Sequence, residues 1–99
     1  DHLDALSAKG TFLVRLPALL GGDQPKGERI LQDVVRKDPN SVNARLSLAK
    51  SYCGGGRHDE AISLASHALD LADLQHSEAF IHEARAVLAQ LQARAARAN

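Results

Sequence analysis

The 99-residue sequence lacks several residue types on which particular functions depend. It has no tryptophan, two phenylalanines and one tyrosine, too few aromatic side chains for a platform that stacks bases or binds sugars. A single cysteine excludes an internal disulfide and leaves the redox compartment open. No apolar run approaches the length needed to cross a bilayer, so we expect no membrane insertion.

Charge of one sign does not dominate either, because 12 basic residues balance 12 acidic ones. No global field therefore draws the chain to nucleic acid or to an anionic membrane. The sequence also has no methionine and no signal peptide, so we expect it to be a processed piece of a longer protein. Its localisation stays open: cytoplasmic by default, periplasmic if a signal has been removed.

Alanine and leucine are the two most frequent residue types of the chain. Both are strong helix formers, and residues that favour strands are few. A chain of this length corresponds to about one domain with one modest core. The composition therefore predicts an all-α protein packed through small side chains.

Breaker residues divide the chain into helical segments. They cluster at 21–25, 37–41 and 54–56, with a softer break at 73–77. Apolar side chains recur between these breaks at steps of three and four. This spacing predicts five helices, over residues 7–20, 24–37, 42–53, 59–72 and 78–91, with a tail that frays beyond Leu91.

Several helix ends carry local signals. Asp23 is placed to cap the second helix, and Pro25 suits its first turn, whose N–H groups have no partner within the helix. Asn40 or Ser41 is placed to cap the third helix, and Ser77 the fifth. Pro17 is expected to kink or loosen the first helix, because it removes a backbone donor.

The helical hairpins repeat with a period of about 34 residues, a length typical of helical repeat proteins. Four pairs of residues occupy equivalent positions at this interval. They are Gly22 and Gly56, Leu31 and Ala65, Val34 and Ala68, and Pro39 and Asp73. In such proteins each hairpin needs a neighbour to cover its apolar face.

One stretch resembles a tetratricopeptide repeat. Its characteristic residues are Asp38-Pro39, Leu48-Ala49, Tyr52, Gly56, Asp59-Glu60-Ala61 and Ala68. Residues 42–75 match well, although Arg45 replaces the usual tryptophan, Ala65 the usual aromatic residue and Asp73 the terminal proline. Residues 8–41 form a degenerate copy, in which Gly27 replaces an alanine and Pro17 departs from the pattern. Residues 77–97 resemble a capping helix, so that residues 1–99 form a single domain.

The resemblance implies a short right-handed α-solenoid of stacked antiparallel hairpins, with a concave groove that binds a peptide or helix of a partner protein. The groove positions that it implies are Lys9, Phe12, Leu16, Leu19, Asn43, Leu46, Lys50 and Phe80. Some family members clamp a terminal carboxylate with lysines and asparagines on this face, a pattern that Asn43 and Lys50 do not complete. As alternatives, Asn43 and Lys50 are plain solvated residues, and Phe12, Leu16 and Leu19 are core residues covered by residues 1–6.

Two other roles stay open beside a non-catalytic scaffold. The chain is alternatively a self-association module, forming a homo-oligomer, or an accessory subunit of a larger envelope or transport assembly. A helix-turn-helix DNA reader is disfavoured, because residues 61–70 contain no lysine or arginine to contact phosphates.

Catalytic, metal and cofactor sites find little support in the sequence. The five histidines form no pair four residues apart, and Cys53 with His58 offers only two ligands where zinc needs more. Cys53, His58 and Asp59 supply the residue types of a nucleophilic site but no oxyanion site. The glycine triplet at 54–56 is not followed by the Lys-Ser/Thr of a phosphate loop. We therefore expect no catalytic residue, no metal and no cofactor.

Overall fold

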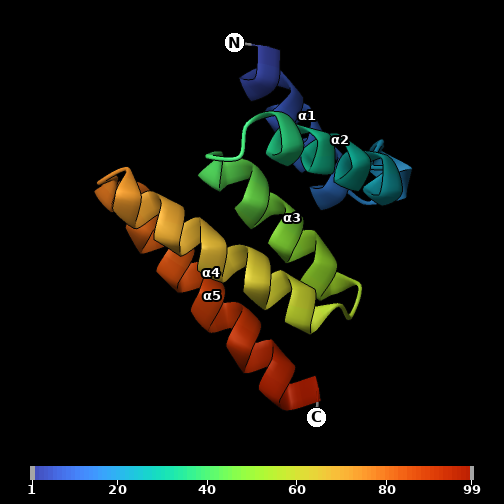
Figure 1. Ribbon diagram of the computed structural model, residues 1–99. Coiled ribbons are helices and arrows are strands. Elements are labelled where there is room, and N and C mark those ends of the chain that lie inside the picture. The colour runs from blue at the N-terminus through green and yellow to red at the C-terminus, as the bar shows by residue number, and fades with distance from the viewer. Residues whose placement is uncertain (1, 99) are drawn as a thin grey trace.

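A computed structural model describes residues 2–98, and these residues are helical with no strand among them. The α-helices are α1 (His2–Arg15), α2 (Gln24–Lys37), α3 (Val42–Gly54), α4 (His58–Leu74) and α5 (Glu78–Ala98). A short 3-10 helix, η1 (Ala18–Leu20), lies between α1 and α2 (Figure 1). The predicted all-α fold class is confirmed. None of the helices within residues 2–98 is both long and apolar enough to cross a membrane.

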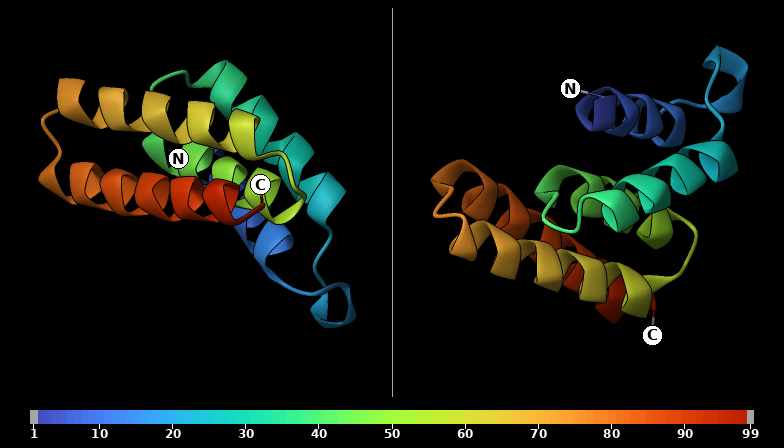
Figure 2. Two further views of the ribbon diagram at one scale, coloured as in Figure 1. Left: turned by 90° about the horizontal axis from the view of Figure 1, so that it is seen from below. Right: turned by 45° about the horizontal axis from the view of Figure 1, so that its top comes forward.

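Two antiparallel pairs of helices, α1–α2 and α4–α5, pack around the central helix α3. α1 packs against α2, α4 packs against both α3 and α5, and α3 contacts each of the other four α-helices. In Figure 1, α3 lies between the α1–α2 pair and the α4–α5 pair. The left view of Figure 2 shows α4 and α5 side by side. The central helix is therefore the element whose faces are most fully covered.

Local capping explains where three helices begin. The Asp23 carboxylate accepts a hydrogen bond from the backbone N–H of Lys26, and the Ser41 hydroxyl accepts one from Ala44 N–H at 3.3 Å. Ser77 Oγ accepts a longer bond of 3.4 Å from Phe80 N–H. Each bond satisfies a donor that the first turn of a helix leaves unpaired. The predicted caps at Asp23, Ser41 and Ser77 are confirmed.

The first predicted helix is displaced along the chain. The segment predicted at residues 7–20 is instead helical over His2–Arg15, and Pro17 stands outside it with an extended backbone. Proline lacks an N–H and disfavours a helical conformation in the residue before it, so the helix ends rather than kinks. The connection to α2 consequently spans residues 16–23, whereas three residues, 55–57, join α3 to α4.

The sequence period therefore holds for one helix of each hairpin and not for the other. α2 begins at Gln24 and α4 at His58, which is one full period later. α1 begins at His2 and α3 at Val42, and this interval is longer than the period by more than one helical turn. The expected fraying beyond Leu91 is also wrong, because α5 continues to Ala98 through an alanine-rich segment that contains no helix breaker.

The core joins a few larger side chains to many alanines. Leu31, Val34 and Leu46 are the largest fully buried side chains. Several alanines of α3, α4 and α5 are completely buried, namely Ala44, Ala49, Ala61, Ala65, Ala68, Ala72 and Ala84. Small side chains let helix backbones approach closely, which makes these positions sensitive to added volume. The core therefore positions α3, α4 and α5 relative to one another.

A polar seam joins α2 to the carboxyl end of α3. The Ser51 hydroxyl donates to the Glu28 carboxylate at 2.6 Å and accepts from Gln24 Nε2 at 3.0 Å. One turn further along α2, Gln32 Nε2 donates to the Tyr52 hydroxyl at 2.8 Å. Since Gln24, Glu28 and Gln32 are spaced four residues apart, they lie on one face of α2. The seam thus fixes the first hairpin against the second.

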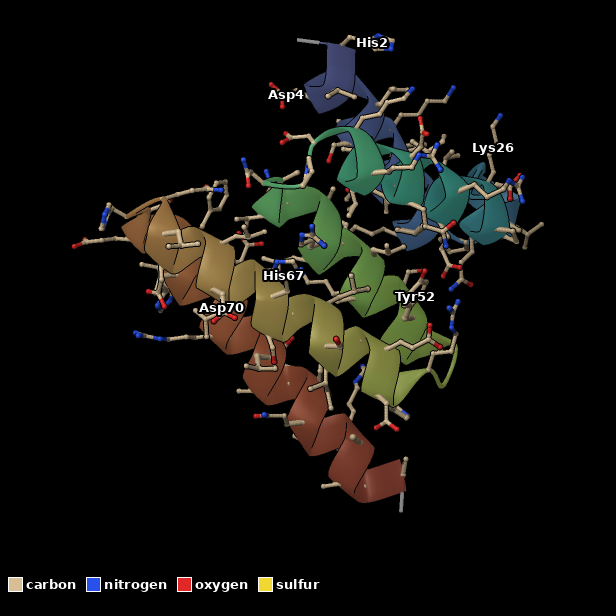
Figure 3. All side chains as sticks on the ribbon, in the orientation of Figure 1. His2, Asp4, Lys26, Tyr52, His67 and Asp70 are labelled. Carbon is tan, nitrogen blue, oxygen red and sulfur yellow. The ribbon has the colours of Figure 1, made fainter. Side chains whose placement is uncertain are left out.

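Arg57 closes the same end of the second hairpin. Its guanidinium lies 3.7 Å from the centre of the Tyr52 ring, and it donates to Glu60 at 3.0 and 2.7 Å. Figure 3 shows Tyr52 at the carboxyl end of α3, next to the loop that leads to α4. The hydrogen bond from Arg57 lowers the pKa of the Glu60 carboxyl. The turn between α3 and α4 is therefore held by an ion pair and a cation–π contact.

Candidate functional site

A groove of about 1220 Å³ is lined mainly by α1 and α3, and α5 adds two residues to its wall. The remaining lining residues of the groove lie outside the helices: Leu16 follows α1, Gln75 follows α4, and three residues belong to the loop before α3. The lining residues are Asp4, Ser7, Ala8, Thr11, Phe12, Val14, Arg15, Leu16, Asp38, Asn40, Ser41, Val42, Asn43, Ser47, Lys50, Ser51, Gln75, Phe80 and Glu83. Thirteen of these 19 residues are polar or charged, and six are apolar.

Five of the sequence-predicted positions meet in this groove: Phe12 and Leu16 from the first hairpin, Asn43 and Lys50 from α3, and Phe80 from α5. Phe12 keeps 56% of its surface exposed, so residues 2–6 do not cover it. Leu16 and Phe80 are half-buried, and Asn43 and Lys50 are exposed. The groove therefore presents apolar side chains at the surface, with polar groups between them.

Three other predicted positions lie elsewhere. Lys9 is exposed on α1 but does not line the groove. Leu19 is on η1 rather than on the first helix and is 98% exposed, because Pro17 ends the helix before it. Leu46 is 1% exposed and belongs to the core, since neighbouring helices cover its side of α3. Leu46 is thus corrected from a groove position to a core position.

Apart from Asn43 and Lys50, the polar residues of the lining were not predicted. Thr11 donates a hydrogen bond of 2.7 Å to Ser47, which ties α1 to α3 within the groove. The lining positions of α1 include 4, 8, 11 and 15, and those of α3 include 43, 47 and 50. Both sets follow the spacing of one helix face. Helical spacing could therefore have identified these polar residues, but the periodicity of apolar side chains alone does not mark them.

Arg45 supports the loop at the amino end of α3, which bounds the groove. Its side chain is 7% exposed, and Nη2 donates to the carbonyl oxygen of Pro39 at 2.8 Å. Burial lowers the pKa of the guanidinium, while the charge of Asp38 opposes this shift. Nε of Arg45 is buried without a hydrogen-bond partner. Arg45 therefore fills a buried position beside the loop that it supports.

A second, smaller hollow of about 480 Å³ adjoins the carboxyl ends of α3 and α5. Its lining residues are Lys50, Cys53, Gln90, Leu91, Ala93, Arg94 and Arg97. Lys50 lines both this hollow and the groove, so the two are neighbours along α3. The hollow contains three basic side chains and no acidic one. Its floor is apolar, because Leu91 and Cys53 are almost fully buried.

The Cys53 and His58 side chains do approach each other, with 3.6 Å between Sγ and Nδ1. Cys53 is a buried free thiol in the last turn of α3, as expected for a small helix-end residue. Among the residues that the structure describes, no three His, Cys, Asp or Glu side chains gather in a way that could hold a metal ion. The pair therefore contributes packing at the α3–α4 turn.

Comparison with known proteins found no relative of this chain. The sequence matches no protein-family model, no curated protein and no solved structure.

Proposed function

We propose that this chain is a non-catalytic scaffold of the tetratricopeptide type, a short right-handed stack of helical hairpins that binds a segment of a partner protein in the groove. The observation that supports the proposal is that three separate helices supply the walls of the groove. α1, α3 and α5 are alternate helices along the chain, and all three contribute to one hollow. The resemblance of residues 42–75 to the repeat supports the same assignment.

The lining of the groove suits a peptide or a helix better than a small metabolite. Phe12, Leu16 and Phe80 offer apolar contacts, and the partly exposed aromatic rings are the kind of side chain that anchors an interface. α3 is 13 residues long, which corresponds to about 20 Å of helix. An extended partner segment of about six residues spans that length.

Selection from a random peptide display library tests this proposal. The bait is the wild-type chain, and the counter-bait is the Phe12→Glu/Lys50→Glu double variant, which places two carboxylates in the groove. The matched control is Leu74→Glu/Lys26→Glu, since Leu74 is 76% exposed, Lys26 is exposed and neither residue lines the groove. Circular dichroism establishes that all three chains keep the same helix content.

We expect peptides that bind the wild type and the control alike and lose at least tenfold in affinity for the groove variant. Replacing a central aromatic anchor costs this much in a typical interface. Peptides that bind all three chains equally, or no selected peptides at all, would show that the groove is not the working surface.

Self-association is the second candidate, and a separate observation favours it. Leu19 and Leu20 on η1 are 98% and 68% exposed, and neither lines the groove. Exposed large apolar side chains that adjoin one another are typical of interaction surfaces. Light scattering over a range of concentrations tests this role. A dimer that Leu19→Ser/Leu20→Ser converts to a monomer would establish it, and a wild type that stays monomeric throughout would remove it.

A further inference from the structure

The structure points to the chemistry of the partner. We propose that Lys50, Arg94 and Arg97 form a subsite for acidic side chains, so that the partner is a peptide segment with carboxylates at the end that lies over the carboxyl ends of α3 and α5. This inference rests on the proposed function of the groove and specifies which segments it accepts and in which direction.

The three cations converge from two helices on one hollow. Lys50 lies in the last turns of α3, while Arg94 and Arg97 are three residues apart near the end of α5 and so share a face of that helix. Each of these side chains is exposed. Within residues 2–98, none of them forms an ion pair with a carboxylate, and no acidic residue lines the hollow. No carboxylate of residues 2–98 therefore neutralises the positive charge at this place.

Complementarity to the helix dipoles does not account for this convergence. A cation at the carboxyl end of a helix interacts favourably with the dipole of that helix, and the effect acts on each helix separately. Bringing the ends of α3 and α5 together adds mutual repulsion between the three charges. Carboxylates bound between them would relieve that repulsion, and arginine can hold a carboxylate through two parallel hydrogen bonds.

The apolar floor of the basic hollow strengthens contacts between these cations and a bound carboxylate. Leu91 and Cys53 are 3% and 4% exposed, so apolar protein lies beneath the cations. Charge-assisted hydrogen bonds are stronger where one side of the pair faces protein rather than water. A carboxylate in this hollow therefore gains more than one that meets an isolated surface arginine.

The charge of the adjoining groove gives the bound segment a direction. Three carboxylates, those of Asp4, Asp38 and Glu83, line the groove beside Arg15 and Lys50, whereas no carboxylate of residues 2–98 lines the basic hollow. Glu83 precedes Arg94 by three turns of helix, or about 16 Å. A segment with carboxylates at one end only fits this arrangement. A polyphosphate backbone or an anionic membrane surface, which is negative throughout, would meet the carboxylates of the groove as well.

The distance between the apolar and basic parts defines the segment further. Phe80 precedes Arg94 by about four turns, which is about 21 Å of helix. An extended chain covers this distance in about six residues. The expected ligand therefore places an apolar anchor about six residues from a cluster of aspartates or glutamates.

The experiment compares peptides selected from a random display library, each about 12 residues long, on three baits. These are the wild type, Arg94→Gln/Arg97→Gln, and the matched control Arg29→Gln/Arg85→Gln. The control removes the same charge from exposed positions that line neither hollow. Synthetic versions of the most enriched peptides, and versions with every acidic residue replaced by its amide, are then titrated by fluorescence anisotropy.

We expect the wild type and the control to enrich peptides with aspartate or glutamate clustered on one side of an apolar anchor. We expect the acidic peptides to bind the wild type at least tenfold tighter than their amide versions, and Arg94→Gln/Arg97→Gln to abolish that difference. The selected peptides are also titrated against Phe12→Glu, which leaves the three cations in place. Peptides that lose affinity for Phe12→Glu but show no acidic enrichment would overturn the subsite and leave the proposed function standing. A failure to select any peptide that depends on the groove would overturn both.

Two further titrations test the competing anionic partners. A single-stranded oligonucleotide and vesicles of anionic phospholipid are each added to the complex with the best acidic peptide. We expect neither to displace the peptide at equal concentration of charge. Displacement by either of them, lost in Arg94→Gln/Arg97→Gln, would assign the basic hollow to nucleic acid or to a membrane surface and overturn the assignment to an acidic peptide.

Discussion

Gly10 and Gly27 meet backbone to backbone where α1 packs against α2. A Cβ on Gly27 would lie 2.8 Å from the carbonyl oxygen of Gly10, and one on Gly10 would lie 3.2 Å from the carbonyl oxygen of Gly27. Both residues are buried. A glycine at position 27 is therefore explained by an approach between the two helices that is too close for any side chain.

We expect Gly27→Ala to destabilise the fold by about 1–3 kcal/mol, because the added methyl group forces the two helices apart. Its Cβ would lie 2.6 Å from Val14 Cγ1 as well as against the backbone of Gly10. Urea unfolding followed by circular dichroism measures the change. Gly54→Ala is the control, since nothing lies within 4 Å of a Cβ at that position. A Gly27→Ala variant as stable as the control would mean that α1 and α2 are not in this contact.

Ala61→Leu tests the packing of α4. Ala61 is completely buried in the core, so we expect overpacking to cost about 1–3 kcal/mol of unfolding free energy. Ala86→Leu adds the same volume at an exposed position of α5 and should change stability by less than about 0.5 kcal/mol. Thermal melts of the two variants give the comparison. Equal melting temperatures would contradict the burial of Ala61.

Ser51→Ala tests the polar seam between the hairpins. Ser51 is 7% exposed and connects Gln24 to the Glu28 carboxylate, so its loss leaves partly buried polar groups without their partner. We expect a destabilisation of about 1–3 kcal/mol in urea unfolding. Ser63→Ala on the exposed face of α4 is the matched control and should be neutral. A neutral Ser51→Ala would show that the seam contributes nothing to stability.

The Arg57–Glu60 pair should make the stability of the fold depend on acid. The hydrogen bond from Arg57 lowers the pKa of Glu60 below its unfolded value, so the folded state binds this proton more weakly than the unfolded state. The stabilisation is complete above the unfolded pKa and is lost as the pH falls through the lowered one. We therefore expect the melting temperature to fall more between about pH 5 and about pH 3 in the wild type than in Glu60→Gln.

Asp59→Asn is the control for this pH dependence. Asp59 lies beside Glu60 in the first turn of α4 but forms no ion pair within residues 2–98. The variant should keep the steeper acid dependence of the wild type. If Glu60→Gln also kept it, the acid sensitivity would have to come from another carboxylate.

The sequence by itself determined the features that depend on a few neighbouring residues. The caps at Asp23, Ser41 and Ser77 each act on a backbone N–H three residues later, so residue type and position suffice to predict them. The abundance of helix formers determined the all-α class in the same way. The resemblance to the repeat implied the groove positions Phe12, Leu16, Asn43, Lys50 and Phe80, which the structure places along one groove.

Only the tertiary structure decided which faces stay open. Leu46 and Lys50 lie on the same helix four residues apart, yet Leu46 is buried and Lys50 is exposed, since burial depends on where the other helices pack. The position of α1 likewise follows from its packing on α2 through Gly10. Lys50 of α3 meets Arg94 and Arg97 of α5 in one hollow, although α4 and two loops separate the two helices along the chain. Such a meeting depends on contacts between distant helices, which local sequence patterns do not encode.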